Sequence, residues 1–170
     1  MAKVSHRNIC KYVDSFIGNG NNKFYLVMEY CDGGDLEQYM MRIKGMNGST
    51  SLPSGLTEHK IWRFLLQICL ALEAIHGEDI VHGDLKPANL LISGREYNIK
   101  LTDFGISQKH SQGCDLVQSD AGTLPYCSPE VLKGEATNQK ADVWSLGCIL
   151  YDMICGKRAF DVANNEEELK

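Results

Sequence analysis

Four polar residues near the middle of the chain have the types and spacing that phosphoryl transfer requires. In the stretch IVHGDLKPANLLI, Asp84 precedes Lys86 and Asn89, and Asp103 follows in TDFG. A carboxylate can hold an acceptor hydroxyl in line, and a lysine can neutralise a migrating phosphoryl group. Asn and Asp oxygens are ligands that suit Mg²⁺. One extended loop would direct Asp84, Lys86 and Asn89 to one point, which Asp103 at the end of a second hairpin could also reach. Together they predict a metal-assisted phosphoryl-transfer site.

Each of these residues also has a purely structural explanation. Asp103 could cap a turn, Asn89 could bind buried backbone groups, and Lys86 could be solvated. Judged singly, each residue favours that explanation, but jointly they favour the site. His82 is interpreted as a packed core histidine and not as a proton carrier.

Two hairpins are expected to position this loop. The run FYLVMEYC, residues 24–31, is bounded by GNGNN and DGGD, which predicts a buried strand between two turns. It is expected to pair with residues 9–17. The runs NLLIS and NIKLTD flank the turn GREY and predict a second hairpin, into which the quoted stretch leads directly.

Three helices are expected around the hairpins. DLEQYMMRIK has helical spacing. The next helix begins at the N-cap Thr57 and ends near Gly77, and apolar residues on several faces, Trp62 and Leu66 among them, predict burial nearly all round. Residues 138–155 predict a second apolar helix that Gly156 stops, with Trp144 in the core.

Composition restricts the class of protein. The chain has 170 residues, 44% of them apolar, and a net charge of −5, which suits one globular domain and excludes a broad nucleic-acid surface. No signal peptide or membrane-spanning run is found, so no membrane partner is expected. Seven cysteines without a C-x-x-C pair predict reduced, buried thiols and no zinc site. An intracellular location, cytoplasmic or nuclear, is expected.

The motifs HGDLKPAN, DFG, GTLPYCSPE and DVWSLGCILYDM occur in the order and spacing of eukaryotic protein kinases, which the chain resembles over nearly its whole length. The Lys86-Pro87 pair resembles the serine/threonine branch, and QICLALEAIH with GTLPYCSPE is most similar to NIMA-related kinases. The resemblance implies an α+β fold, mostly the helical C-terminal lobe. Residues 1–31 would be a remnant of the small lobe, and residues 32–170 a large lobe that is incomplete at its C-terminus.

The same resemblance implies the catalytic roles. Asp84 would be the catalytic base that orients a Ser/Thr hydroxyl on a protein substrate, and Lys86 would lie beside the transferred phosphate. Asn89 and Asp103 would hold Mg²⁺. Thr123 would contact the base and help to define Ser/Thr specificity.

The ATP site is implied in the same way. Met28 resembles the gatekeeper, and Glu29 and Cys31 would bind adenine through backbone groups. Asp35 would reach the ribose, and Leu91 would lie under the adenine ring. The resemblance therefore predicts ATP and Mg²⁺ as cofactors.

Further positions carry regulatory or structural expectations. Asp142 resembles the helix acid that holds the catalytic loop from beneath, and His82 and Phe104 resemble the apolar spine. Gly83 stands where kinases of this type usually carry an arginine that binds the activation-segment phosphate. Phosphorylation of Ser111 or Ser119 is therefore predicted to have little effect on activity.

The chain also differs from the pattern of the family in its small lobe. The chain opens at SHRNICKYVDSF, and neither a glycine-rich loop nor a V-A-I-K-like lysine with its glutamate partner precedes it. We expect these residues alone to bind ATP weakly and to be marginally stable, since a full ATP site needs the missing small lobe. Retention of Asp84, Lys86, Asn89 and Asp103 favours a fragment of an active Ser/Thr kinase. The alternative is an inactive pseudokinase or docking module that uses the large lobe as a binding surface.

Overall fold

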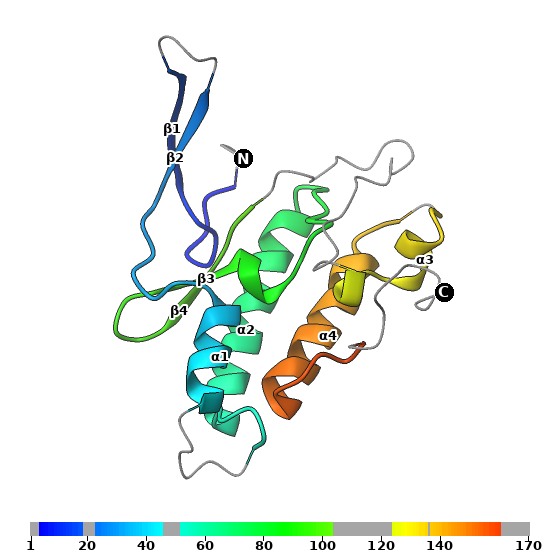
Figure 1. Cartoon of the computed structure of the whole chain (residues 1–170). Helices are drawn as coiled ribbons and strands as arrows, with labels where there is room; N and C mark the ends of the chain where they lie inside the picture. The colour runs from blue at the N-terminus through cyan, green and yellow to red at the C-terminus, as the bar shows by residue number, and fades with distance from the viewer. Residues whose placement is uncertain (1–3, 19–22, 46–51, 104–123, 136, 161–170) are drawn as a thin grey trace.

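The computed structural model describes residues 4–18, 23–45, 52–103, 124–135 and 137–160. Two small sheets and a group of helices form the molecule (Figure 1). In chain order the elements are β1 (Tyr12–Ile17), β2 (Phe24–Met28), α1 (Leu36–Gly45), α2 (Glu58–His76), η1 (Pro87–Asn89), β3 (Leu90–Ser93), β4 (Asn98–Leu101), η3 (Leu124–Tyr126), α3 (Pro129–Leu132) and α4 (Lys140–Cys155).

The β1–β2 hairpin projects away from the helices (Figure 1). Every residue of β2 is exposed, with Phe24 at 68%, so the prediction of a buried strand is wrong for this structure. The described residues supply no third strand to this sheet, so its apolar side chains on both faces stay exposed. The predicted pairing with the preceding run is confirmed, although β1 begins at Tyr12 and not at Ile9.

Residues 8–10 leave the hairpin and pair with β4 instead. Ile9 forms a parallel bridge with Leu101, the Cys10 N–H donates to the Leu101 carbonyl at 2.8 Å, and the Leu101 N–H donates to the Asn8 carbonyl at 2.8 Å. This pairing joins the two sheets through the backbone. It explains why the predicted first strand is shorter than its apolar pattern.

The β3–β4 hairpin is confirmed. Its strands pair in antiparallel register from Leu90 opposite Leu101 to Ser93 opposite Asn98. Side chains alternate between buried and half-buried along both strands, as expected when one face of a sheet packs on a core. The buried face, which contacts α2, consists of Leu90, Ile92, Ile99 and Leu101.

Helix α2 begins where the sequence predicts. The Thr57 hydroxyl accepts a hydrogen bond from the Lys60 N–H at 3.3 Å and caps the first turn.

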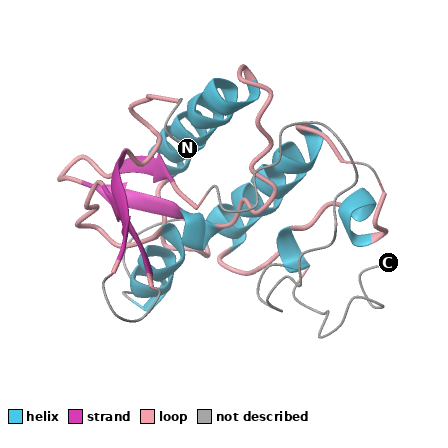
Figure 2. Cartoon of the chain, turned by 90° about the horizontal axis from the view of Figure 1, so that it is seen from above, coloured by secondary structure: helices cyan, strands magenta, loops and turns pink. Residues whose placement is uncertain are grey.

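The faces of α2 are less buried than predicted. Trp62 and Leu66 are 61% and 60% exposed, so the prediction of burial nearly all round is wrong. Helix α2 packs against β4 and α4, and the face that carries these two residues is left to solvent. Figure 2 shows the helices grouped beside the strands.

Helix α4 begins at Lys140, two residues after the predicted Asn138, and ends at Gly156 as predicted. Trp144 is 39% exposed and stacks on Phe160 with ring centroids 5.8 Å apart, so its assignment to the core is wrong. The face that α4 buries consists of Ala141, Asp142, Ser145, Cys148, Ile149, Asp152 and Met153.

Gly156 gives the first testable prediction. Its φ is +65°, and a Cβ added there would lie 2.9 Å from Ser54 Cα and 3.0 Å from the Pro53 carbonyl oxygen. We expect Gly156→Ala to lower the free energy of unfolding by about 2 kcal/mol, because it adds backbone strain to a clash with backbone atoms. Urea denaturation measures this change. Gly147→Ala, in the same helix with open space at its Cβ, is the control and should be neutral or stabilising. Equal effects of the two substitutions would contradict the prediction.

The prediction of reduced, buried cysteines is confirmed in part. The six cysteines in the described part of the chain are free thiols, but Cys69 is exposed, which corrects the expectation that all are buried. Among the described residues, no helix is both long and apolar enough to cross a membrane.

Candidate active site

A buried carboxylate on α4 fixes the loop that carries Asp84. Asp142 is 1% exposed, and its oxygens accept the His82 N–H at 2.9 Å and the Gly83 N–H at 3.0 Å. One of these oxygens also lies 2.8 Å from His76 Nε2 at the end of α2. Asp142 therefore holds the loop from beneath, as the resemblance implied, and ties it to two helices.

His82 connects the loop to the end of β4. It is fully buried, its Nε2 lies 2.9 Å from the Thr102 carbonyl oxygen, and its Nδ1 accepts the Asp84 N–H at 3.2 Å. Because Nδ1 accepts a bond, the proton of the neutral ring lies on Nε2 and is donated to Thr102. The interpretation of His82 as a packed core histidine is confirmed.

The Asp84 side chain has two different oxygens. Its Oδ2 lies 2.8 Å from Lys86 Nζ and accepts the Asn89 Nδ2–H at 3.1 Å, and the same Asn89 nitrogen also donates to the Asp84 carbonyl at 2.8 Å. Its Oδ1 is buried and has no hydrogen-bond partner among the described residues. Leaving a buried acceptor without a donor costs free energy, so this oxygen is suited to a hydroxyl from outside the chain.

Asn89 and Asp103 are brought to the same region by the start of β3 and the end of β4. The Thr102 N–H donates to the Asn89 carbonyl at 3.0 Å, so Asp103 directly follows a residue bonded to Asn89. Asp103 is exposed and has a φ of 64°, which Asp tolerates better than most residues. The two hydrogen bonds of the Asn89 amide to Asp84 use its nitrogen, so its oxygen and the Asp103 carboxylate are a donor set that fits Mg²⁺.

Three of the predicted nucleotide-binding residues, Met28, Asp35 and Leu91, lie in β3 or contact β3 or the end of β4. Thr102 Oγ1 lies 3.9 Å from Met28 Sδ at the end of β2. Asp35 forms an isolated antiparallel bridge with Leu91 in β3. Asp35 Oδ1 also accepts the Gln38 N–H at 2.8 Å in the first turn of α1, which leaves its second oxygen for a ligand. The structure therefore brings these residues together beside the Asp84 loop.

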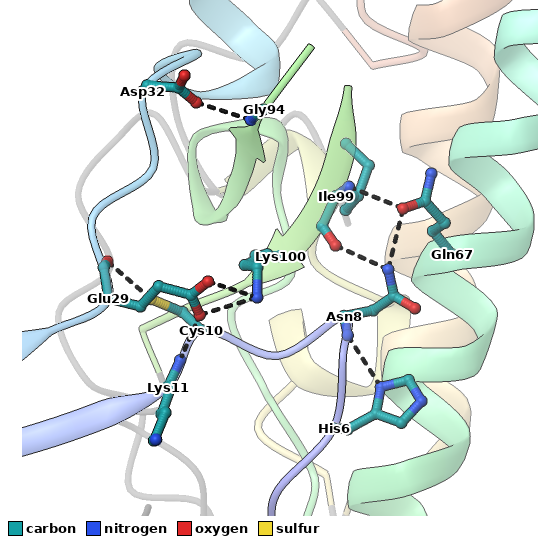
Figure 3. A network of polar contacts seen from close by, with 10 residues as sticks. All are labelled: His6, Asn8, Cys10, Lys11, Glu29, Asp32, Gln67, Gly94, Ile99 and Lys100. Atoms are coloured by element: carbon teal, nitrogen blue, oxygen red, sulfur yellow. Dashed lines mark hydrogen bonds and ion pairs between the residues drawn. The ribbon is translucent and has the colours of Figure 1, made fainter. Parts of the chain in front are cut away.

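Glu29 is held by an ion pair that the sequence analysis did not identify (Figure 3). Lys100 Nζ lies 2.7 and 2.8 Å from its two carboxylate oxygens, and the Lys11 N–H donates to one of them at 3.2 Å. Burial alone would raise the pKa of Glu29, but these bonds outweigh it and hold the pKa below its ordinary value. The pair links the segment after β2 to the strand that leads to Asp103.

The two thiols beside Glu29 are neutral. Burial is the main cause that raises the pKa of Cys10, and it raises the pKa of Cys31 to about 11. Cys10 donates a weak bond to the Glu29 carbonyl at 3.5 Å, while the Glu29 N–H is taken by the Lys11 carbonyl at 2.8 Å. The Glu29 carbonyl therefore keeps acceptor capacity for a ligand, whereas its N–H does not.

A second polar network anchors the start of the chain (Figure 3). Asn8 is 1% exposed, and its Nδ2 donates to Gln67 Oε1 at 3.0 Å and to the Ile99 carbonyl at 2.9 Å. The same Gln67 oxygen accepts the Ile99 N–H at 2.9 Å. A polar Gln67 within the apolar run of α2 was the signal available in the sequence, but its partners were not.

Gly83 has a backbone conformation that suits glycine. Its φ is +77°, and a Cβ added there would meet no atom within 4 Å. A side chain at this position would be accommodated in space but would strain the backbone.

Four residues with predicted roles lie outside the described residues: Phe104, Ser111, Ser119 and Thr123.

Comparison with known proteins agrees with this geometry. A model of the protein kinase domain matches residues 1–170. Serine/threonine-protein kinase Nek5 of Mus musculus is 38% identical over 164 residues, which are 96% of this chain and 25% of that protein. Serine/threonine-protein kinase nekl-2 of Caenorhabditis elegans is also 38% identical over 164 residues, 96% of this chain and 45% of that protein.

Serine/threonine-protein kinase Nek2 of Homo sapiens is 34% identical over 172 residues, 98% of this chain and 37% of that protein. The chain thus spans less than half the length of each of these relatives. The α+β kinase-like fold and the likeness to NIMA-related kinases that the motifs predicted are confirmed. The matched domain and the ordered motifs together show that the chain belongs to the protein kinase family.

Proposed function

We propose that the protein containing this chain transfers the γ-phosphate of ATP to a Ser or Thr hydroxyl of a protein substrate. The observation that carries the proposal is the environment of the Asp84 carboxylate. Lys86 and Asn89 hold one of its oxygens, and the other is buried with no partner. Such an oxygen can accept the hydrogen bond of a substrate hydroxyl and orient it as a catalytic base.

The neighbouring side chains support the same chemistry. We assign Lys86 to the transferred phosphate and Asn89 and Asp103 to Mg²⁺, which when bound would neutralise the charge of the phosphate oxygens. Lys86 now lies 2.8 Å from Asp84, so the same ammonium group is within reach of the acceptor hydroxyl's site. Thr123 is assigned to Ser/Thr discrimination on the motif alone.

ATP would lie beside β3 and the segment that follows β2. We assign Met28 as gatekeeper, Glu29 and Cys31 to adenine, Asp35 to the ribose and Leu91 to the face of the ring. The Met28 contact with Thr102 and the bridge between Asp35 and Leu91 support this placement. For Glu29 only the carbonyl is available, because its N–H is already bonded to Lys11.

A non-catalytic binding module is the second candidate. The exposed apolar surface of β1 and β2 favours it, since contiguous apolar patches commonly mark interaction surfaces. The two functions differ in whether phosphate is transferred. For either one we propose an intracellular location, cytoplasmic or nuclear, and a protein partner.

Phosphotransfer by the full-length protein tests the proposal. With labelled ATP, Mg²⁺ and a peptide library that contains Ser, Thr and Tyr, we expect label on phosphoserine and phosphothreonine only. Removing divalent cations with EDTA should abolish the transfer, because both proposed metal ligands act through the cation. Unlabelled peptides in the presence of Mg²⁺, together with measurable peptide binding, would favour the binding module instead.

A further inference from the structure

A cavity of about 170 Å³ lies between α1 and the end of α4. Its lining includes two acids, Glu37 from α1 and Asp152 from α4, together with Tyr126 from η3. Arg158, two residues after the glycine that ends α4, also lines it, as do the lysines Lys44 and Lys157.

Tyr126 links the cavity to a hollow that Asp84 lines. Tyr126 lines this cavity and also a smaller hollow whose walls include Gly83 and Asp84. Of the described residues, Tyr126 is the one that both linings share. An extended peptide advances about 3.4 Å per residue, so we expect side chains two or three residues from an acceptor at Asp84 to come close to Tyr126.

The acids of the cavity are bound by groups of the chain itself. The Tyr126 hydroxyl donates to Asp152 Oδ2 at 2.7 Å, and Asp152 is 5% exposed. Arg158 lies 3.2 Å from Glu37 Oε1 and is also hydrogen-bonded to Tyr126. A chain of polar contacts therefore runs from Glu37 through Arg158 and Tyr126 to Asp152.

These contacts keep Arg158 positively charged. Burial alone would lower the pKa of Arg158, but Tyr126 and Glu37 outweigh it and raise the pKa, so the guanidinium stays charged. A second cation brought into the cavity would meet this charge at close range, which is unfavourable in a partly buried site. Without Arg158, Lys44 and Lys157 would still line the cavity, but Glu37 would lose its ion-pair partner and would attract a cation more strongly.

We propose that Arg158 is a specificity-determining residue that rejects Lys and Arg side chains within a few residues of the phosphorylated Ser or Thr. The inference rests on the proposed kinase function and names its substrate class, acceptor segments without a basic residue near the hydroxyl. Specificity of this kind uses a repulsive group against the wrong partner.

Paired peptides test the inference with the full-length protein. Each pair places Arg or Ala at one position within three residues of a fixed Ser, on either side. We expect the wild type to phosphorylate the Arg peptides no faster than the Ala peptides. Arg158→Ala should raise the Arg-to-Ala ratio of kcat/KM about tenfold at one position, which corresponds to about 1.4 kcal/mol. Arg158→Lys, which keeps the charge, should leave the ratio low.

Two controls separate the cavity from general charge effects. Arg63→Ala removes an arginine that is likewise paired with a glutamate, Glu96 at 3.5 Å, but lies outside the cavity, and it should not change the ratio. Adding Glu37→Gln to Arg158→Ala should remove most of the gain, because the acid that attracts the new cation is then neutral.

Equilibrium binding distinguishes failure of the inference from failure of the proposed function. Fluorescence anisotropy measures binding of the same peptide pairs to the wild type and to Arg158→Ala without ATP. If no peptide is phosphorylated but Arg158→Ala gains affinity for the Arg peptides, the kinase proposal fails and the role of Arg158 stands. An Arg-to-Ala ratio that Arg158→Ala leaves within twofold, in rate and in binding, overturns the inference.

Discussion

Replacing Asp84 with asparagine is expected to reduce kcat of the full-length protein about 10³-fold, a typical contribution of a positioned catalytic base. The amide keeps the shape of the side chain, and its oxygen can still accept the Asn89 bond that Asp84 Oδ2 accepts at 3.1 Å. What is lost is the negative charge and the acceptor oxygen without a partner. The KM for ATP should change far less than kcat, because Asp84 is assigned to the acceptor and not to the nucleotide.

Initial rates at saturating ATP measure this effect. The control is Asp14→Asn on β1, where the exposed side chain only accepts the adjacent Ser15 N–H at 2.7 Å and an amide oxygen can do the same. Thermal unfolding of both variants verifies that each is folded. If Asp84→Asn retained a tenth or more of the wild-type kcat, Asp84 would not be the base and the proposed function would lose the observation that carries it.

Asp142→Ala is expected to cause the largest loss of stability, about 4 kcal/mol. The substitution leaves the buried His82 N–H and the Gly83 N–H without an acceptor and removes the partner of His76. The buried His82 donor left unsatisfied costs about 1–3 kcal/mol, and the bonds to the exposed Gly83 N–H and to His76 are lost in addition. The chain is therefore expected to approach complete unfolding, since small domains have only about 5–15 kcal/mol of stability.

Urea denaturation followed by circular dichroism measures this loss. Asp142→Asn is the informative companion, because its amide offers one oxygen where the carboxylate accepts two backbone N–H groups with separate oxygens. We expect it to fall between the wild type and Asp142→Ala. Glu78→Ala, which removes an exposed carboxylate just after α2, is the surface control and should stay within about 0.5 kcal/mol of the wild type. A loss for Asp142→Ala as small as that control would show that the loop is held by other contacts.

Several features of this protein follow from short segments of its sequence. The cap at Thr57, the stop at Gly156 and the β3–β4 hairpin all appear where they were predicted. Each depends on a hydrogen bond or a backbone angle within a few residues, so the local sequence contains its cause. The catalytic loop and the family are recognisable for the same reason, because Asp84, Lys86 and Asn89 lie in one short motif.

Burial could not be predicted in this way. The runs around Phe24, Trp62 and Trp144 are all apolar, yet these side chains are 68%, 61% and 39% exposed. An apolar pattern states that a residue favours burial, but whether an element covers it depends on how the other elements pack. The sequence therefore identified the two hairpins and the three longest helices, missed the short helix α3, and assigned too many faces of these elements to the core.

The partners of the charged groups were decided by the tertiary structure alone. Glu29 pairs with Lys100 and Glu37 with Arg158, and Asp142 holds the backbone of Gly83. These partners are 71, 121 and 59 residues apart in the chain. The sequence shows that a carboxylate is present but not which donor it faces, because an electrostatic contact requires two groups within about 4 Å and only the packing of helices on strands sets that distance.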